Sequence, residues 1–530
     1  MNTKAVNIAM FWIAILCIAL PCLMVQSQYL VNGNISWLLI AADRLLHGQS
    51  MSQNIYETNP PLSIIIYIPH VLAAKLMGIK LPVMSYYVTS FFIILSVITT
   101  YKITTYITHL SSIQRYTFVA CYALCTTLIT TVFFSDREHL ILLGLAPFVL
   151  LQFLLLERVT IPKTLLYSVC FVGAFCVLIK PHYGLLPTVF LVTRLIKHRQ
   201  INFFKAPDFQ ALSIMTLIYI GVVLTYFHDY VSIILPDVFA LYAQSGADFF
   251  AILDASQIHM LTYITFFLFE VFREDLKKHQ KSLVVFIYSC CILSLVPYYV
   301  QLKGYYNHLI PAYAFFMMGL CLTLMFRSES LIKVKKLNIL QFIIPFVALM
   351  SLANAISPLN TDFPKHKNIP QMPVSRFLEE HCPAPCTYFA FHGDIEIMNP
   401  TTAYMGYVHA SRFPVFWFLP RILTLLRDED PKIRETGLTL MNKYTAMAAE
   451  DLIQYKPDIL LIAIDLPVDN LKTFTFLSFF GLNQDFKQEI DENYEKIGVL
   501  EFDRVEYFTG TTLEYSYTLK YQAYKRKTNL

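Results

Sequence analysis

Apolar stretches long enough to cross a membrane recur along the chain between residues 7 and 357, and short polar connections separate them. A helix needs about 20 mostly apolar residues to cross the hydrocarbon core of a bilayer. The pattern therefore predicts a polytopic α-helical membrane protein with about eleven spans. The predicted spans are residues 7–27, 83–107, 115–134, 139–157, 163–180, 182–196, 210–227, 250–272, 282–300, 308–326 and 338–357.

The connections between these stretches differ in charge, and the difference predicts the side on which each one lies. Lysine and arginine gather at residues 158–163, 194–205, 273–281 and 327–336. Short connections rich in these two residues remain on the cytoplasmic side of a membrane. The N-terminus is then cytoplasmic too. The alternate connections and the region after residue 357 are extracytoplasmic, in a bacterial-type inner or plasma membrane.

Residues 61–77 are apolar enough to form a further span, which would reverse the side of every later connection. The stretch is short and contains a proline and a histidine. We therefore expect a juxtamembrane or re-entrant helix within a first outer loop over residues 28–82. This loop also holds an amphipathic stretch, Ile35–Leu46, in which Trp37 is expected to lie at the membrane interface.

The composition changes at about residue 358, where charged residues become frequent and prolines mark a linker. We therefore divide the chain into a transmembrane domain, residues 1–357, and a C-terminal extracytoplasmic α/β domain, residues 358–530. Short apolar runs and helical patterns support the second domain. The expected strands are residues 387–391, 459–464 and 496–500, and the expected helices are about 374–381, 416–427, 431–444 and 446–455.

The overall composition agrees with a membrane protein. Hydrophobic residues make up 56% of the 530 residues, charged residues 15%, and the mean hydropathy is +0.51. A soluble domain is less apolar. The net charge of +4 is small and its basic residues lie in short connections, so no nucleic-acid partner is expected. Most cysteines lie in apolar stretches, but Cys382 and Cys386 lie in a polar one. They could form a disulfide, whereas their spacing fits a redox motif less well.

The predicted outer connections carry the ionisable and aromatic residues that could perform chemistry. Ionisable groups are costly at membrane depth and tend to be retained for function. Their crowding on one predicted face indicates a single active site there. The runs are Asp136-Arg137-Glu138-His139, Lys180-Pro181-His182-Tyr183, His228-Asp229 and Lys303-Gly304-Tyr305-Tyr306-Asn307-His308.

The first outer loop contains Asn32-Gly33-Asn34-Ile35-Ser36-Trp37, an acid at Asp43, and Tyr56-Glu57-Thr58-Asn59-Pro60-Pro61-Leu62 at the entrance of an apolar helix. Together with the many spans and the outer C-terminal domain, it resembles the GT-C superfamily of glycosyltransferases. This superfamily includes the protein O-mannosyltransferases and the lipid A aminoarabinose transferases. The resemblance implies a GT-C-like fold and a polyprenyl-phosphate sugar donor. Such enzymes place an aspartate early in this loop, whereas residues 32–35 here hold no carboxylate.

Glu57 and Asp43 are the only carboxylates of the first outer loop. General-base catalysis needs a carboxylate placed to take a proton from the acceptor hydroxyl. By elimination, one of the two is predicted to be the catalytic base. The alternatives are a surface ion pair or capping contact with Arg44 for Asp43, and a structural role at a helix entrance for Glu57.

The run from Asp136 to His139 offers two kinds of chemistry. Asp136, Glu138 and His139 could ligate a divalent metal, while Arg137 could clamp a phosphate with paired donors. The alternative is a salt-bridge network that caps two helices. Lys180 could neutralise a lipid phosphate, or it could extend to the membrane surface from a helix end.

The turn that begins at Lys303 looks like the tyrosine-rich turn before a proline-containing helix in many polyprenyl-phosphate sugar transferases. The resemblance implies that Lys303 and His308 meet the donor phosphate. An aromatic belt at the interface with a basic anchor is the alternative. The residues expected to contact the sugar or line the cavity are His182, Tyr183, Tyr305, Tyr306, His228 and Asp229.

These features predict an integral membrane glycosyltransferase that moves a sugar from a lipid-linked donor to an envelope lipid, glycan or protein, with inversion at the anomeric carbon. Nucleotide sugars are cytoplasmic, so a transferase of the outer face needs a donor that has crossed the membrane. The alternatives are a transporter or flippase for lipid-linked glycans, a glycan ligase or polymerase, and a non-catalytic assembly protein. A divalent metal cofactor is left open.

Overall fold

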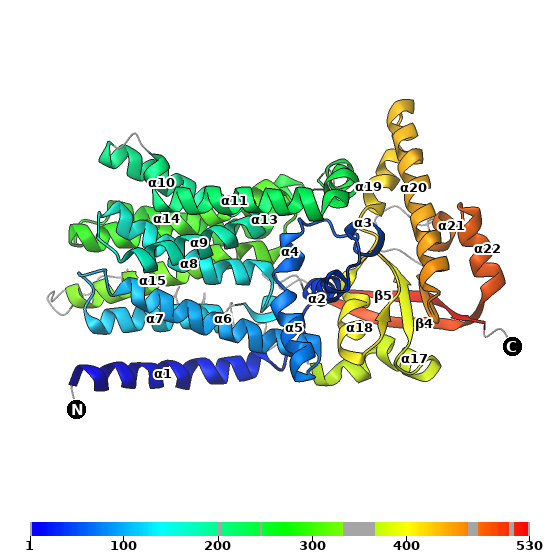
Figure 1. Cartoon of the computed structure of the whole chain (residues 1–530), viewed down its shortest axis with the longest axis horizontal. Helices are drawn as coiled ribbons and strands as arrows, with labels where there is room; N and C mark the ends of the chain where they lie inside the picture. The colour runs from blue at the N-terminus through cyan, green and yellow to red at the C-terminus, as the bar shows by residue number, and fades with distance from the viewer. Residues whose placement is uncertain are drawn as a thin grey trace. The chain divides into compact units, whose positions relative to one another are not determined.

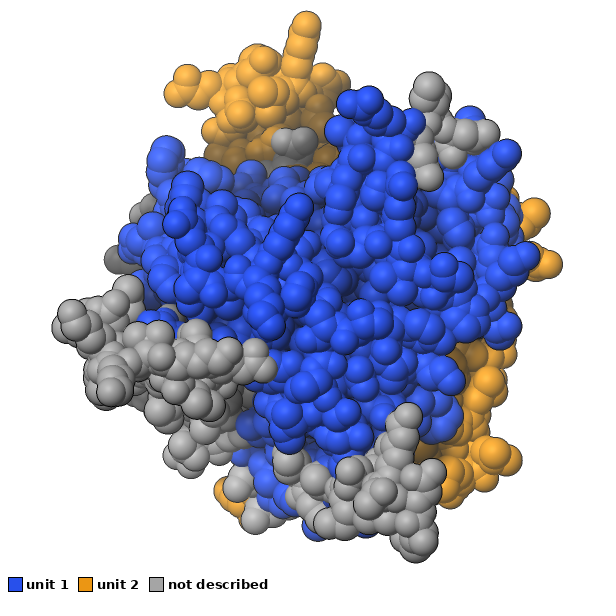
Figure 2. All heavy atoms as spheres, turned by 90° about the vertical axis from the view of Figure 1, so that its left-hand side faces the viewer, with its two compact units in different colours: residues 1–29, 85–222, 247–363 blue, residues 30–84, 223–246, 364–530 orange. Residues whose placement is uncertain are grey.

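The computed structural model describes residues 3–128, 130–199, 203–243, 246, 248–331, 366–464, 475–507 and 514–527. The chain divides into two compact units, which are coloured separately in Figure 2. Unit 1 comprises residues 1–29, 85–222 and 247–363, and unit 2 comprises residues 30–84, 223–246 and 364–530.

Unit 1 is a bundle of long apolar helices that run side by side (Figure 1). They begin and end close to the predicted apolar stretches. The helices that lie wholly or mostly in this unit are α1 (Thr3–Gln26), α6 (Leu81–Thr104), α7 (Ser112–Thr127), α8 (Arg137–Leu156), α9 (Lys163–Ile179), α10 (Leu185–His198), α11 (Pro207–Tyr226), α13 (Phe249–Phe272), α14 (Lys278–Gln301) and α15 (Ile310–Leu331). Short 3-10 turns join them at η1 (Thr131–Phe133), η2 (Pro181–Gly184), η3 (Phe203–Lys205) and η6 (Tyr306–Leu309).

Within the described part of the chain, five helical stretches are long and apolar enough to cross a membrane. They are Leu81–Thr104, Arg137–Leu156, Pro207–Tyr226, Lys278–Gln301 and Tyr306–Arg327. These stretches support a helical protein embedded in a membrane. The number of spans and the side of each connection stay predictions. The expected span over residues 338–357 lies outside the described residues.

Unit 2 contains a five-stranded mixed sheet in the order β2-β1-β3-β5-β4. β1 pairs in parallel with β2 and β3, while β5 pairs antiparallel with β3 and β4. β1 and β3 are almost wholly buried, which explains their continuous apolar sequences. The strands are β1 (Thr387–Phe391), β2 (Val408–His409), β3 (Ile459–Ala463), β4 (Tyr494–Tyr507) and β5 (Glu514–Arg526).

The helices of unit 2 include those expected after residue 358, with one difference. The two helices expected at 431–444 and 446–455 are one continuous helix, α20, because no residue between them interrupts the helical hydrogen bonds. The helices and turns in this region are η7 (His366–Gln371), α17 (Pro373–His381), η8 (Ile395–Ile397), α18 (Asn399–Met405), α19 (Leu419–Leu426), α20 (Pro431–Tyr455), α21 (Phe476–Phe480) and α22 (Gln484–Asn493). The sheet and helices of this region confirm the small α/β fold.

The first loop also folds within unit 2. Its helices are α2 (Gly33–Leu46), α3 (Met51–Asn54), α4 (Leu62–Ile65) and α5 (Ile68–Met77). α2 packs against α18 and η8, and a Cβ atom at Gly33 would lie 2.8 Å from the Ile395 carbonyl oxygen. Glycine is therefore required at this close approach. The boundary expected at residue 357 lies outside the described residues and stays a prediction.

Two expectations for this loop can be compared with the structure. The segments α4 and α5 together form one apolar helical stretch, Leu62–Met77, which is shorter than the helices long enough to cross a membrane. The juxtamembrane or re-entrant placement expected for it stays a prediction. The interfacial role expected for Trp37 is wrong, because its side chain is fully buried within unit 2.

Three further short segments of this unit are η4 (Tyr230–Ile234), α12 (Leu235–Asp237) and η5 (Val238–Tyr242), of which η4 and η5 are π-helical.

Candidate functional site

Three connections of unit 1 bring their charged side chains into one buried group. Asp136 and the first two residues of α8 form a run of three, the residue that follows α9 is a lysine, and η6 supplies two residues. Every member is less than a tenth exposed to solvent. We call this group the Glu138 cluster. Its members are Asp136, Arg137, Glu138, Lys180, Asn307 and His308.

The carboxylate of Glu138 is the centre of the cluster. Lys180 Nζ donates a charge-assisted hydrogen bond to Oε1, and His308 Nε2 lies 3.2 Å from the same oxygen. Asn307 Nδ2 donates to Glu138 Oε2 at 3.1 Å and to Asp136 Oδ2 at 3.2 Å. A buried carboxylate needs such partners, since an uncompensated charge in a low-dielectric interior is very costly.

The chain places Asp136 at the start of α8 through a tight local turn. Ser135 has a left-handed backbone with φ of 73°, and its N–H donates to His139 Nδ1 at 3.1 Å. Asp136 then caps α8, because its Oδ1 accepts the N–H of Arg137 at 2.6 Å. Burial and the negative charge of Glu138 raise the pKa of Asp136. Arg137 Nε lies 3.8 Å from Asp136 Oδ1, an ion pair beyond hydrogen-bond distance.

Lys180 has an extended backbone because Pro181 follows it, and α9 ends at the preceding residue. Its side chain turns into the bundle toward Glu138, and its Nζ lies 3.2 Å from His308 Nε2. The alternative in which Lys180 extends to the membrane surface is therefore wrong. Tyr183 is fully buried and donates to the His308 carbonyl at 3.2 Å, which ties η2 to η6.

The other residues predicted in unit 1 differ in exposure and in their contacts. Lys303 is half-buried in the turn before η6, and burial lowers the pKa of its ammonium group. Tyr305 is 52% exposed. The ring of Tyr306 lies 6.3 Å from that of His259, and His182 Nε2 lies 3.1 Å from the amide nitrogen of Gln301. The structure thus brings Arg137, Lys180 and His308 into one group, and the phosphate-binding role of each stays a prediction.

The metal predicted at Asp136, Glu138 and His139 stays a prediction. His139 Nδ1 accepts the Ser135 N–H, and Glu138 accepts a hydrogen bond from Lys180. Two of the three predicted ligands therefore already have hydrogen-bond partners within the protein. Among the described residues, one set of three histidine, cysteine or acidic groups lies within metal-binding reach. It consists of Cys382, Cys386 and Asp458 in unit 2.

Glu57 lies in unit 2 and is 3% exposed. Its Oε2 accepts the indole N–H of Trp37 at 2.7 Å. Its Oε1 accepts the N–H of Asn59 at 3.0 Å, the Thr58 hydroxyl at 3.2 Å and the side-chain amide of Asn59. These donors fix the carboxylate in one orientation, and the run Glu57-Thr58-Asn59 folds around it.

Asp43 has a different environment on α2. It is one-third exposed, and Lys75 Nζ lies 2.7 Å from its Oδ1. Asp43 therefore pairs with Lys75 and not with Arg44. Arg44 instead donates to the carbonyl oxygens of Asn54 at 2.7 Å and Ser411 at 2.6 Å, and to that of His409.

His228 is exposed, and Asp229 is half-buried and accepts the N–H of Ser52 at 2.7 Å. Asp229 therefore holds α3 in place. The cavity or sugar contacts expected of these two residues stay predictions.

Sequence reasoning missed a carboxylate in unit 2, Asp237. Its Oδ2 accepts the hydroxyls of Tyr56 at 2.5 Å and Tyr444 at 2.8 Å, and Lys443 Nζ at 2.6 Å. Burial raises the pKa of both tyrosines. A lone acid in the apolar run 230–242 was a signal that could have identified it. The contact also anchors Tyr56, the residue before Glu57.

No protein-family model matches the chain, and no curated protein shows significant similarity to it.

Proposed function

We propose that the protein is an integral membrane glycosyltransferase of the GT-C type. It moves a sugar from a polyprenyl phosphate to a hydroxyl group of an envelope acceptor. The observation that carries the proposal is the convergence of Arg137, Lys180 and His308 in one buried cluster of unit 1. Nitrogen donors of this kind bind phosphate, and burial strengthens their attraction for an anion.

In this proposal the Glu138 cluster binds the donor phosphate and stabilises the negative charge that develops on it as the sugar leaves. The bond between the anomeric carbon and the phosphate oxygen breaks. A bond from the acceptor oxygen to that carbon forms from the opposite side, which inverts the carbon. The acceptor proton passes to a general base, and polyprenyl phosphate is released.

Glu57 is the proposed base. It is buried and oriented by Trp37 and Asn59, and a carboxylate oxygen that accepts one hydrogen bond can accept another from a substrate hydroxyl. Asp43 suits this role less well, because it is partly exposed and already paired with Lys75.

The test uses the full-length protein in detergent with synthetic polyprenyl-phosphate hexoses and pentoses, and an envelope extract as acceptor. Release of polyprenyl phosphate reports transfer whatever the acceptor is. We expect Glu57→Gln to lower turnover by about 10²–10⁴, the usual cost of losing a general base. The control is Glu450→Gln, a change of a 64% exposed carboxylate in the same unit, which should leave turnover unchanged.

Two results would contradict the proposal. Turnover of Glu57→Gln within about threefold of the unaltered protein would exclude this base, since the expected loss is at least about a hundredfold. Passage of the intact donor across reconstituted vesicles, without release of polyprenyl phosphate, would identify a flippase instead.

A further inference from the structure

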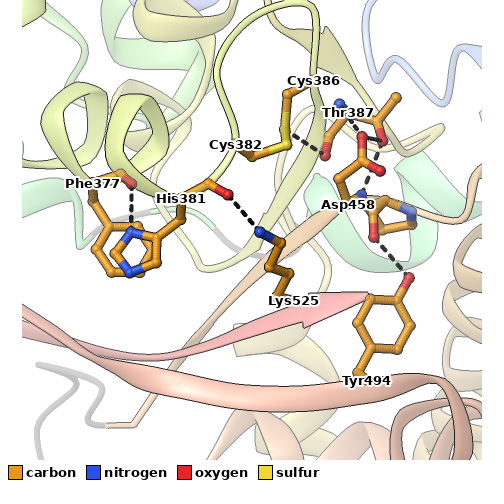
Figure 3. The surroundings of a disulfide bond; sticks show 9 residues. Phe377, His381, Cys382, Cys386, Thr387, Asp458, Tyr494 and Lys525 are labelled. Atoms are coloured by element: carbon orange, nitrogen blue, oxygen red, sulfur yellow. Dashed lines mark hydrogen bonds between the residues drawn. A yellow bond between two sulfur atoms is a disulfide. The ribbon is translucent and has the colours of Figure 1, made fainter. Parts of the chain in front are cut away.

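Unit 2 holds two sulfur atoms and a carboxylate close together at one end of its sheet. A disulfide joins Cys382, directly after α17, to Cys386, directly before β1, with 6.0 Å between their Cα atoms (Figure 3). Asp458 directly precedes β3, which pairs in parallel with β1. The two sulfurs and one Asp458 carboxylate oxygen all lie within 4.8 Å of one another.

The carboxylate of Asp458 is held rigidly. Its Oδ2 accepts the Thr387 N–H at 2.9 Å and the Thr387 hydroxyl at 2.8 Å, and the Asp458 N–H donates back to that hydroxyl at 2.9 Å (Figure 3). Within the described part of the chain, no hydrogen bond involves the other oxygen, Oδ1. Cys382 and Asp458 are half-buried, so solutes can reach the group from outside.

The geometry points to a redox-gated metal site. We infer that reduction of the Cys382–Cys386 disulfide creates a site for Zn²⁺, with both thiolates and Asp458 as ligands. Three residues separate the two cysteines, which falls within the spacing of two to four that is typical of zinc-binding pairs. The disulfide form described above is the closed state of this site.

The ligand set suits zinc in both type and reach. Thiolate and carboxylate ligands bind zinc at about 2.3 Å and about 2.0–2.2 Å, and tetrahedral geometry places two thiolates roughly 3.8 Å apart. Side-chain rotation can give this separation while the backbone stays in place. Three protein ligands leave a fourth position for water.

Opening and closing the zinc site requires an external thiol or disulfide that exchanges two electrons with the two cysteines. An external dithiol reduces the protein disulfide, its own two sulfurs join, and Zn²⁺ then displaces the two protons of the cysteine thiols. In the reverse step, an organic disulfide accepts two electrons and two protons and becomes two thiols. The protein thiolates join and Zn²⁺ is released.

The test compares oxidised and reduced full-length protein in detergent, with a phosphine as reductant because it competes little for zinc. Zinc retained after gel filtration and the near-ultraviolet thiolate-to-cobalt absorption of Co²⁺-loaded protein are measured. We expect the reduced form to retain about one metal ion per chain more than the oxidised form. Asp458→Asn should weaken binding at least about tenfold, because altering even a residue that only supports a ligand costs about 10–100-fold in metal affinity.

The oxidised protein is a control within the same folded chain, so a folding defect cannot mimic the result. Cys382→Ser/Cys386→Ser should abolish the reduction-dependent binding. Cys22→Ser/Cys321→Ser, which alters two free cysteines of unit 1, should retain it. Equal metal content in both redox forms, persistence of binding in Cys382→Ser/Cys386→Ser, or unchanged affinity in Asp458→Asn would each overturn the inference.

Discussion

Breaking the ion pair between Lys180 and Glu138 should destabilise unit 1 strongly. Lys180→Met keeps the length of the side chain but leaves the fully buried Glu138 carboxylate without its cation. Removing one partner of a buried pair typically costs about 3–5 kcal/mol. Because Asn307 and His308 still contact this carboxylate, we expect the lower end, about 3 kcal/mol, in the free energy of unfolding.

The double variant makes the prediction sharper. Glu138→Gln alone leaves a buried lysine uncompensated, at a similar cost of about 3 kcal/mol. Lys180→Met/Glu138→Gln leaves neither charge, so its total cost should be no more than about 3 kcal/mol, the cost of either single change, rather than the sum of about 6 kcal/mol. The coupling energy between the two residues would then be about 3 kcal/mol or more, at the top of the range measured for residues in contact.

The assay is equilibrium unfolding in a fixed mixture of mild and denaturing detergents, followed by far-ultraviolet circular dichroism. The matched control is the pair of Lys197 and Glu157 in the same unit, whose side chains are 46% and 37% exposed. Its coupling should be below about 1 kcal/mol, because solvent screens exposed pairs. Additivity of the Lys180 and Glu138 changes within about 0.5 kcal/mol would refute the reasoning.

Three further predictions concern other parts of the chain. Burial lowers the pKa of His409, so only the unfolded chain takes up a proton on this ring as the pH falls below about 6.5. The free energy of unfolding should then fall by up to about 1.4 kcal/mol per pH unit because of this residue. Thermal unfolding between about pH 7 and 5 should show that His409→Gln removes this contribution. Trp37→Phe removes a hydrogen-bond donor to Glu57 and should lower the free energy of unfolding by about 1–3 kcal/mol. An unchanged free energy of unfolding would argue against this contact. An impermeant maleimide on intact cells should label Tyr305→Cys and spare Lys278→Cys, whereas the reverse refutes the predicted topology.

The positions of the long helices could be predicted because they depend on the length of apolar runs. α8, for example, spans Arg137–Leu156 where residues 139–157 were expected. The buried strands of unit 2 were equally visible, since β1 and β3 are short continuous apolar runs. β5 was missed, because its polar and aromatic residues give no comparable apolar run.

The contacts within the sites could not be predicted, because they join residues far apart in the chain. The sequence singled out Glu138, Lys180 and His308 separately, but their pairing depends on how three helices pack. Trp37 shows the same limit. An amphipathic pattern identifies an apolar face but not whether lipid or protein covers it, and here α18 and η8 pack against the helix that carries this residue.

The charge balance of the Glu138 cluster constrains how it could hold a phosphate. Arg137 and Lys180 balance Asp136 and Glu138, so with neutral His308 the cluster carries no net charge. A phosphodiester adds one negative charge, which would be costly to bury alone. Uptake of a proton by His308, or by Asp136 with its raised pKa, restores the balance.

Donor affinity should then fall up to about tenfold per pH unit above the pKa of the group that takes up the proton. Calorimetric titration in buffers of different ionisation enthalpy measures this proton, and zero uptake would place the phosphate elsewhere.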